Sequence, residues 1–282
     1  MPVLIHRDIL GLRDTLGAWR HRGARIALVP TMGALHEGHL ALVAAARAAA
    51  DIVVTSIFVN PTQFAPHEDL SRYPRDEDGD LAKLRAAGCD LVWLPKVETM
   101  YPKGSATFVE VSGVSDEFEG AIRPGHFRGV ATVCTKLFLQ TGADIAVFGE
   151  KDWQQLQVVR RAVRDLDLPI HILPVPTVRD ADGLALSSRN RFLTAEERAR
   201  AALLYAALSR AATAVAAGCN AAEALAPEDA ALRSAGFAPE YLALVEAESM
   251  RPMDRATSGV ALRIVAAARL GTVRLLDNIA VA

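Results

Sequence analysis

The sequence has few cysteines, and its positive and negative charges nearly balance. Only three of the 282 residues are cysteine, and 31 Lys and Arg stand against 33 Asp and Glu. Cys89, Cys134 and Cys219 lie far apart, so we expect neither a disulfide framework nor a C-x-x-C metal or redox motif, but three reduced, mostly buried thiols. A net charge of −2 argues against a protein that binds a long nucleic-acid backbone. Any anion that it binds should be small and recognised by a few residues at one site.

Long apolar runs and two common nucleotide motifs are also missing. No stretch offers about 18 uncharged apolar residues, and "MPVLIHRDIL" lacks the features of a secretory signal, so we expect a cytoplasmic protein without membrane spans. Neither G-x-G-x-x-G nor G-x-x-x-x-G-K-[ST] occurs, which excludes the dinucleotide fingerprint and the P-loop. With 51% hydrophobic and 23% charged residues, the chain has a globular composition and enough length for one large or two ordinary domains.

The first two thirds of the chain alternate β-branched runs with alanine-rich amphipathic stretches. Continuous apolar strands joined by helices indicate a parallel sheet that is covered on both faces. The predicted fold class is therefore α/β, with a doubly wound, Rossmann-like parallel sheet. We expect strands over 25–30, 51–60, 90–95, 107–111, 144–148 and 170–175, and helices over 39–50, 76–87, 129–141 and 152–166.

Beyond about residue 190 the pattern changes to that of a smaller α+β domain. Thr194, the acidic residues after it and a glycine at 218 predict one capped helix over 194–218. A boundary near 177–190 divides the chain into predicted domains 1–177 and 178–282. A second helix is expected over 221–235, and strands of a largely antiparallel sheet over 240–247, 259–270 and 273–281.

Four predicted strands end in segments rich in glycine and polar residues: "PTMG", "NPTQF", "GEKDWQQ" and "PTVRDADGLALSSRN". In doubly wound sheets, ligands bind outside the carboxyl ends of the strands, near the point where the strand order reverses. One pocket formed by all four segments is therefore predicted.

His36 and His39 lie where the first of these strands turns into a helix. Free backbone N–H groups and the positive end of the helix dipole attract anions there. Cβ atoms three residues apart on a helix are about 5–6 Å from each other, so one polyphosphate can contact both imidazoles. Gly33 and Gly38 allow close backbone approach or positive φ. Zinc is the alternative ligand, but H-E-G-H lacks the spacing of H-E-x-x-H and has no Cys or third His nearby.

A strand end, a tight glycine turn and H-x-G-H resemble the nucleotidyltransferase superfamily that includes class I aminoacyl-tRNA synthetases. "FVNPTQF", "YPR", "RPGHFRGVATV", "FGEKDWQQL" and "DGLALSSRNRFL" narrow the resemblance to the pantothenate synthetase (pantoate–β-alanine ligase) family, across almost the whole chain. The resemblance implies a two-step synthesis. Pantoate attacks ATP to give pantoyl adenylate and pyrophosphate, and β-alanine then displaces AMP to give pantothenate.

The resemblance also assigns residues to ATP. His36 and His39 would bind the phosphates, with His39 as proton donor. The Lys151 ammonium would place a positive charge near the same phosphates. Asp152 and Gly149 would hold the ribose, and the backbone at position 178 would support adenine. The full set matched to ATP is Pro30, Thr31, Met32, Gly33, Gly38, Gly149, Glu150, Asp152, Val178 and Leu186.

The remaining family positions concern a closing loop and the acid substrate. Ser187, Ser188 and Arg189 take the place of the K-M-S-K-S loop of the related synthetases and would close over the β- and γ-phosphates. The neutral amides of Gln63 and Gln155 would bind pantoate without adding charge that competes for phosphate, and Asn60 would line the same pocket. Trp153 is interpreted as packing.

Metal and partner expectations follow from the same family. Asp80 would supply a magnesium carboxylate, although an acidic run at a helix start is also typical of a solvated face, and Gly79 replaces an Asp of some relatives. Mg²⁺ is expected chiefly with ATP, without a tightly bound organic cofactor. The predicted partners are pantoate, β-alanine, ATP and a second copy of the chain, with no nucleic acid or membrane. Arg123, His126 and Arg128 would border the substrate mouth without individual roles.

Three other functions remain as alternatives. A nucleotidyltransferase acting on a phosphorylated substrate would need further cations in the acceptor pocket, whereas Gln63 and Gln155 are neutral. A tRNA synthetase would need a basic anticodon-binding module, for which the roughly 90 residues after "SSRN" leave little room. A non-catalytic nucleotide-binding module would have lost at least one of the catalytic candidates, which are all present: His36, His39, Lys151 and Arg189.

Overall fold

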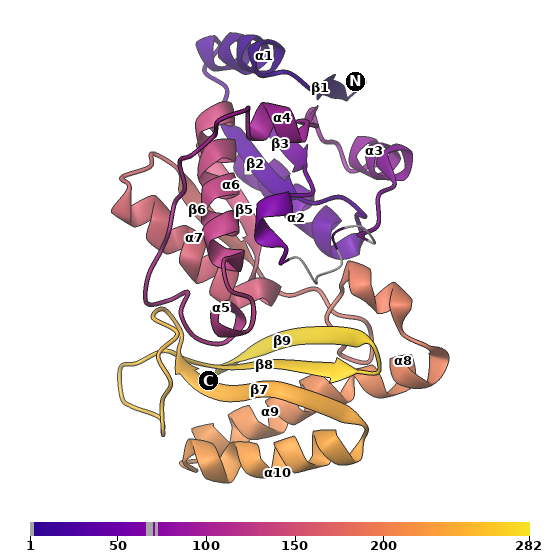
Figure 1. Cartoon of the computed structure of the whole chain (residues 1–282), viewed down its shortest axis with the longest axis vertical. Coiled ribbons are helices and arrows are strands. Elements are labelled where there is room, and N and C mark those ends of the chain that lie inside the picture. The colour runs from indigo at the N-terminus through magenta and orange to yellow at the C-terminus, as the bar shows by residue number, and fades with distance from the viewer. Residues whose placement is uncertain (1–2, 66–69, 71–72) are drawn as a thin grey trace. The chain divides into compact units, whose positions relative to one another are not determined.

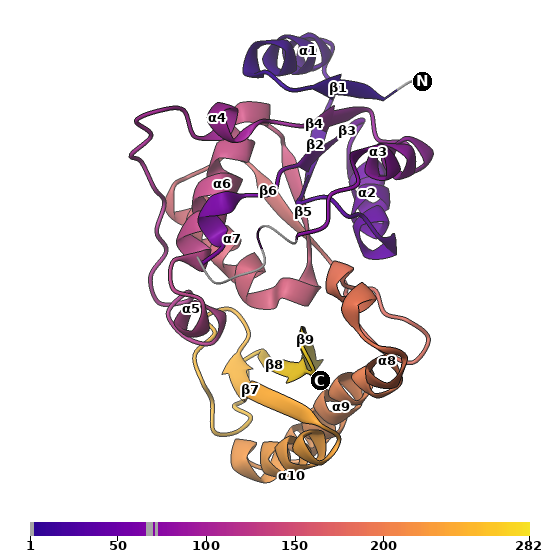
Figure 2. The ribbon, with the colours of Figure 1, turned by 45° about the vertical axis from the view of Figure 1, so that its right-hand side comes forward.

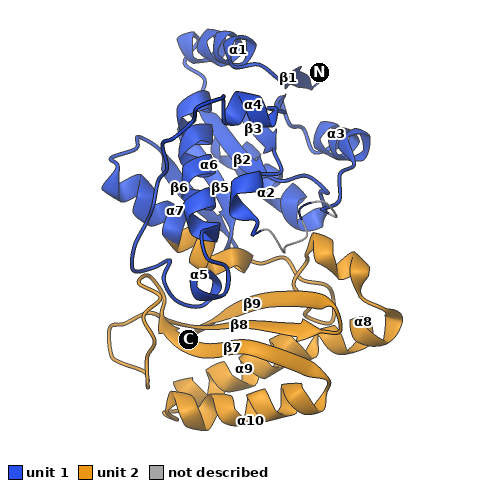
Figure 3. Ribbon diagram, viewed as in Figure 1, with its two compact units in different colours: residues 1–150, 158–176 blue, residues 151–157, 177–282 orange. Residues whose placement is uncertain are grey.

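The computed structural model describes residues 3–65, 70 and 73–282, which divide into two compact units (Figure 3). The first unit runs to Glu150 and also includes Val158–Pro176. The second unit combines Lys151–Gln157 with Thr177–Ala282. The unit change after Pro176 lies next to the predicted domain boundary, but the sequence does not signal that 151–157 groups with the second unit.

The first unit is built around a six-stranded sheet in which every strand pair is parallel. This confirms the doubly wound α/β fold class. Its central strands are apolar and almost wholly buried, as a sheet covered on both faces requires. In spatial order the strands are β1 (Leu4–His6), β4 (Leu91–Trp93), β3 (Ile52–Ile57), β2 (Ile26–Thr31), β5 (Ile145–Gly149) and β6 (His171–Val175).

Helices cover both faces of this sheet (Figure 2). Helix α2 packs on β2, β3 and β5 and contacts α3, whereas α6 contacts β2 and α1. Figure 2 shows α2 and α3 on one side of the strands and α6 and α7 on the other. The long helices of this unit are α1 (Ile9–His21), α2 (Glu37–Ala49), α3 (Glu77–Ala86) and α6 (His126–Thr141), with short helical segments at α4 (Val97–Met100), α5 (Glu119–Ile122) and η1 (Pro61–Gln63). Two further elements, η2 (Glu150–Asp152) and α7 (Trp153–Asp165), are divided between the two units.

The strand order reverses between β2 and β5. From β2 the chain adds β3 and then β4 on one side, and it later adds β5 and β6 on the other side. The carboxyl ends of β2 and β5 therefore flank the crevice where doubly wound folds bind their ligands. The H-x-G-H turn follows β2, and the G-E-K-D segment follows β5.

Two parts of the first unit differ from the sequence prediction. The segment 107–111 is not a strand but an irregular, mostly exposed stretch, where the N–H of Val109 donates to the hydroxyl of Thr132 on α6 (2.9 Å). This contact with a helix takes the place of the pairing with a neighbouring strand that the prediction implied. The sequence prediction also lacks β1 and α1, although Asp8 caps α1 through the N–H of Gly11.

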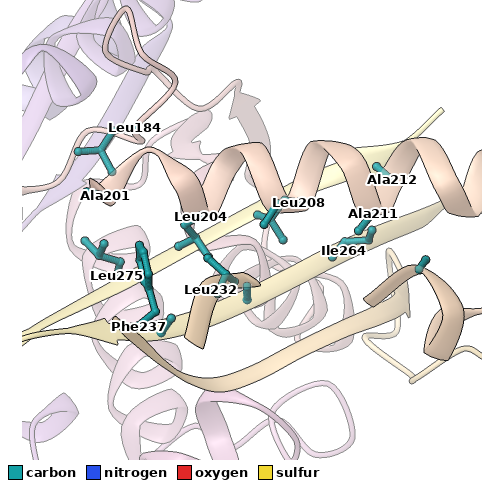
Figure 4. Packing of buried hydrophobic residues seen from close by; sticks show 14 of the residues in the cluster. Leu184, Ala201, Leu204, Leu208, Ala211, Ala212, Leu232, Phe237, Ile264 and Leu275 are labelled. Carbon is teal, nitrogen blue, oxygen red and sulfur yellow. The ribbon is translucent and has the colours of Figure 1, made fainter. Parts of the chain in front are cut away.

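The second unit contains a three-stranded antiparallel sheet, as predicted, with two helices on one face (Figure 1). Apolar residues of α9 and α10 pack on this sheet, and Figure 4 shows Leu204 and Leu208 of α9 in the same cluster as Ile264 of β8. The elements are η3 (Ser188–Phe192), α8 (Ala195–Ala201), α9 (Leu203–Ala216), α10 (Ala221–Ser234), β7 (Phe237–Glu246), β8 (Leu262–Leu270) and β9 (Val273–Val281).

The single helix expected over 194–218 is interrupted. It begins at the predicted cap, where Thr194 and Glu197 form a reciprocal capping box. At Ala202, however, ψ is −16°, closer to a tightened 3₁₀ turn than to an α-helix. The chain continues from there as a separate helix, α9.

None of the helices in the described part of the chain combines the length and apolar character that a membrane crossing requires. All three cysteines are free thiols. Cys89 and Cys134 are buried and Cys219 is partly exposed, and burial raises the pKa of Cys89 and raises that of Cys134 to about 12.

The thiols should therefore differ sharply in reactivity, because the thiolate is the nucleophile and a raised pKa lowers its fraction at a given pH. At pH 8 we expect only Cys219 to react rapidly with a chromogenic disulfide in the folded protein, and all three thiols to react in denaturant. Cys219→Ser should remove the rapid phase. A rapid phase that persists in this variant would contradict the burial of the other two thiols.

Candidate active site

The two histidines of the H-x-G-H segment cap helix α2. Nδ1 of His36 accepts the backbone N–H of Gly38 (3.2 Å), and Nδ1 of His39 accepts the N–H of His36 (3.3 Å). Together they form a capping box in which histidines replace the usual hydroxyl and carboxylate side chains. The ring centroids are 4.2 Å apart. The prediction that the two imidazoles lie together at a helix start is thus confirmed.

These contacts fix which nitrogen carries the proton. A neutral imidazole has one donor and one acceptor nitrogen, and in both His36 and His39 the Nδ1 atom is the acceptor. The hydrogen of each neutral ring is therefore on Nε2. The helix start thus provides two side-chain N–H donors in addition to its dipole, an arrangement suited to phosphate oxygens.

The turn before His36 is held by residues of α3. Asp80 is 1% exposed, and its two oxygens accept the N–H groups of Ala34 (2.8 Å) and Leu35 (2.7 Å). Burial raises the pKa of the Asp80 carboxyl, while these N–H groups and the charge of Lys83 oppose the rise. Lys83 donates to the carbonyl of Leu35 (2.6 Å).

This environment tests the magnesium contact predicted for Asp80. Mg²⁺ takes octahedral oxygen coordination and usually keeps several waters, whereas the Asp80 oxygens are enclosed and occupied by backbone donors. Asp80 in this position does not fit a hydrated Mg²⁺. Among the described residues no group of three or more His, Cys, Asp or Glu side chains is arranged to hold a metal ion.

Asn60 and Gln63 follow β3 and are both buried. The amide nitrogen of Asn60 donates to Oε1 of Gln63 (3.0 Å) and to the carbonyl of Gly129 (3.1 Å). Its oxygen accepts from Thr62 (2.9 Å) and from the Tyr101 hydroxyl (2.8 Å). Asn60 therefore orients Gln63 in this structure. Nε2 of Gln63 points one hydrogen at the sulfur of Met32 (3.2 Å), a weak acceptor that leaves the second N–H available to a ligand.

Two residues without a predicted role also hold Gln63. Nδ1 of His126 lies 2.9 Å from the Gln63 carbonyl, and Nε2 of the same ring lies 3.1 Å from the Arg123 guanidinium. A Cβ at Gly129 would lie 2.5 Å from the carbonyl oxygen of Thr62, so only glycine lets α6 approach η1 this closely. Arg128, from the same "RPGHFRG" segment, stacks on the ring of Phe108, 3.9 Å from its centroid.

The segment after β5 is bonded to strands of the second unit. The carbonyl of Lys151 accepts from the Asn278 side chain (2.8 Å). The indole N–H of Trp153 donates to the carbonyl of Ala247 (2.7 Å), and the guanidinium of Arg263 lies 3.4 Å from the centre of its ring. Trp153 is a packing residue, as predicted, and in addition a hydrogen-bond donor. The Lys151 ammonium lies 3.5 Å from the Asp152 carboxylate.

The remaining predicted residues form a hairpin and a capped turn. The N–H of Leu186 donates to the carbonyl of Val178 (3.0 Å), closing the hairpin. Arg179 forms a bidentate ion pair with Asp277 (2.7 and 2.8 Å), which connects the hairpin to β9. Ser187 then caps η3 by accepting the N–H of Arg189 (3.3 Å).

The predicted site residues are thus divided between the two units. Apart from Asp80 on α3, those of the first unit gather at the carboxyl ends of three neighbouring strands, whereas the others belong to the second unit. That all of them meet in one pocket stays a prediction. The first group comprises Pro30, Thr31, Met32, Gly33, His36, Gly38, His39, Asn60, Gln63, Gly149 and Glu150, and the second Lys151, Asp152, Gln155, Val178, Leu186, Ser187, Ser188 and Arg189.

An H-x-G-H pair that opens a helix at the switch point of a doubly wound sheet defines a class, the nucleotidyltransferase-like α/β proteins. Within that class the chain belongs to the pantoate–β-alanine ligase family, whose model matches residues 4–280.

Relatives and solved structures agree with this membership. The pantothenate synthetase of Acidiphilium cryptum is 56% identical over 98% of this chain and 99% of its own. That of Rhizorhabdus wittichii is 58% identical over 98% of both chains. A crystal structure of pantothenate synthetase from Thermus thermophilus has a TM-score of 0.92 at 48% identity, covering 99% of both chains. A pantoate–β-alanine ligase structure from Francisella tularensis has a TM-score of 0.84 at 31% identity, covering 99% of this chain and 97% of its own.

The indole contact of Trp153 gives a stability prediction. Trp153→Phe keeps a ring beneath Arg263 but removes the N–H bond to Ala247, so the free energy of unfolding should fall by about 1 kcal/mol. Urea unfolding followed by circular dichroism measures the change. Trp19→Phe, the same substitution at a half-buried position of α1, is the matched control and should change stability by less than about 0.5 kcal/mol. Equal effects of the two substitutions would argue against the bond.

Proposed function

We propose that the chain is an ATP-dependent pantoate–β-alanine ligase that makes pantothenate, AMP and pyrophosphate through a pantoyl-adenylate intermediate. The observation that carries the proposal is the pair of Nε2–H donors at the start of α2, at the switch point of the sheet. Family membership supports the substrates. The Francisella tularensis ligase was solved in complex with β-γ ATP and β-alanine.

In the first step a carboxylate oxygen of pantoate attacks the α-phosphorus of ATP. The bond from this phosphorus to the oxygen bridging the β-phosphate breaks, and pyrophosphate leaves with the electron pair. Negative charge builds on the leaving group, where the Nε2–H donors of His36 and His39 stabilise it more than they stabilise bound ATP. Donors preorganised in this way lower the barrier because they need no reorientation during the reaction.

In the second step the amine of β-alanine attacks the acyl carbon of the adenylate. The bond from this carbon to the phosphate oxygen breaks, AMP leaves, and the new amide nitrogen gives up a proton to solvent. The intermediate is a mixed anhydride that water would hydrolyse, so the site has to hold both reactants close and exclude water. Gln63 and Gln155 bind pantoate through neutral amides, which leaves the positive charge of the site for phosphate.

Further charged and polar groups act on ATP in this proposal. Lys151 places an ammonium near the phosphates, and Asp152 and Gly149 bind the ribose hydroxyls. Ser187, Ser188 and Arg189 add two hydroxyls and a guanidinium that close over the β- and γ-phosphates, and Val178 and Leu186 border adenine. Closure of the C-terminal domain as a lid would bring this charge into place only when ATP is bound.

The ion, the assembly and the cellular location belong to the same proposal. Mg²⁺ enters with ATP and offsets the phosphate charge, and the protein works as a homodimer. Three free thiols suit a reducing compartment, which supports a cytoplasmic location.

A coupled assay tests the function. AMP should form only when ATP, pantoate and β-alanine are all present, whereas ATP–pyrophosphate exchange should require pantoate alone. Exchange that depends on a phosphorylated alcohol instead would assign the chain to another nucleotidyltransferase activity. No nucleotide turnover with any acceptor would indicate a binding module.

His39→Ala removes one of the two imidazole donors. Pyrophosphate exchange should fall roughly 10²–10³-fold, the usual cost of deleting one donor to transition-state charge, while the far-ultraviolet circular dichroism stays unchanged. His21→Ala, an exposed histidine on α1, serves as the matched control and should keep full activity. Near wild-type turnover by His39→Ala would refute the role given to this histidine.

Gln63→Glu changes the charge of the acid pocket with little change of shape. A carboxylate in place of the amide would repel the pantoate carboxylate, so KM for pantoate should rise at least about tenfold. KM for ATP, measured in the same experiments, is the internal control and should change less than about threefold. Equal increases in both constants would show that Gln63 does not act on pantoate selectively.

A further inference from the structure

Helix α3 contacts the turn between β2 and α2 at three backbone groups. Asp80 accepts the N–H groups of Ala34 (2.8 Å) and Leu35 (2.7 Å), and Lys83 donates to the carbonyl of Leu35 (2.6 Å). Residues three apart lie on the same face of a helix, so one face of α3 carries both an acceptor and a donor for this turn. The next residue along the chain is His36, the cap of α2.

The turn has a conformation that requires such support. Gly33 has φ of 83°, and Ala34 has φ of 52°, a left-handed conformation that is uncommon for a residue with a Cβ atom. Unfavourable backbone conformations persist only where the surroundings determine them strongly. The two Asp80 bonds act directly on Ala34 and on the residue after it, so they hold the strained part of the turn.

The backbone of Gly33 also lies close to the carboxylate of Asp80. A Cβ at position 33 would lie 3.0 Å from Oδ2 of Asp80 and 3.1 Å from Cγ2 of Ile57. Glycine is thus needed at this position both for its positive φ and because the carboxylate approaches so closely. The turn, the glycine and the buried carboxylate form one local arrangement that sets where α2 begins.

We propose that Asp80 and Lys83 are positioning residues for the imidazoles of His36 and His39, and that Asp80 acts through the turn instead of through Mg²⁺. Both histidine rings are bonded to the first backbone groups of α2. A displaced turn would therefore move their Nε2–H donors away from the reacting phosphates. The kinetic part of this inference rests on the proposed ligase function, whereas the structural part does not.

The central variant is Asp80→Asn, which keeps the shape but replaces one accepting oxygen by an NH₂ group that cannot accept a backbone N–H. Its matched control is Asp78→Asn, which removes the same charge from an exposed position of α3. In the ligand-free protein, hydrogen exchange measured by nuclear magnetic resonance should be at least tenfold faster at the amide of Ala34 or Leu35 in Asp80→Asn. The control should exchange as the wild type does.

Kinetics separate positioning from metal binding. At saturating ATP, Asp80→Asn should lower kcat for pyrophosphate exchange at least tenfold, while the Mg²⁺ concentration at half-maximal rate stays within twofold of the wild type. A metal ligand would behave differently. A tenfold rise of that Mg²⁺ concentration, recovery of the rate by excess Mg²⁺ and unchanged amide exchange would overturn the proposal.

Two other outcomes test the positioning role of Asp80 and the ligase function separately. Asp80→Asn kinetics indistinguishable from those of Asp78→Asn would show that the turn does not control the histidines, even if its amides exchange faster. Suppose that amide exchange is faster in Asp80→Asn but the wild type makes no AMP. The role of Asp80 in holding the turn would then stand, and the ligase function would be rejected. The two hypotheses can therefore fail separately.

A second variant covers the case in which Asp80→Asn does not fold. Lys83→Met removes the donor to the Leu35 carbonyl but leaves the carboxylate, and Arg85→Met, exposed on the same helix, is its control. Lys83→Met should lower kcat at least threefold, with an unchanged Mg²⁺ requirement and faster exchange at the amides of the turn. Identical behaviour of the two methionine variants would refute the inference.

Discussion

The backbone N–H groups at the start of α2 determine the chemistry of the proposed phosphate site. They occupy Nδ1 of His36 and Nδ1 of His39, so that Nε2 carries the proton in both neutral rings. Other features serve this arrangement. The strand order places the turn at the switch point, α3 holds the turn through Asp80 and Lys83, and the helix dipole adds positive potential.

The fold could be predicted in outline because hydrophobic pattern determines burial. Continuous apolar runs such as 144–148 become parallel strands covered on both faces, and the capping residue Thr194 begins a helix where its pattern indicates. The segment 107–111 shows the limit, since a strand-like run of residues gives no information about whether a partner strand is near. Three-residue β1, whose Leu4 and Ile5 are 42% and 40% exposed, has too short a pattern to be distinguished from a loop.

The candidate site was predictable where side chains form a motif, and not where side chains act on the backbone of distant segments. Asp80 contacts Ala34 across 46 residues, and Asn278 contacts Lys151 across 127. Similarly, His126 acts on the carbonyl of Gln63. A backbone carbonyl or N–H is the same in every residue, so no spacing in the sequence marks these contacts. The family resemblance suggested a metal ligand at Asp80, because the sequence does not distinguish a carboxylate that binds a metal ion from one that binds backbone N–H groups.

The bonds that join residues 151–157 to the second unit have a consequence for chimeric proteins. A hybrid that took everything after Pro176 from a relative would combine Lys151 and Trp153 of one parent with Ala247, Arg263 and Asn278 of the other. The stacking of Arg263 on Trp153 would then require that each parent supply the right side chain by chance, and the two hydrogen bonds to backbone carbonyls would require the two backbones to match closely. Only an exchange that transfers 151–157 together with the later residues keeps this cluster within a single lineage.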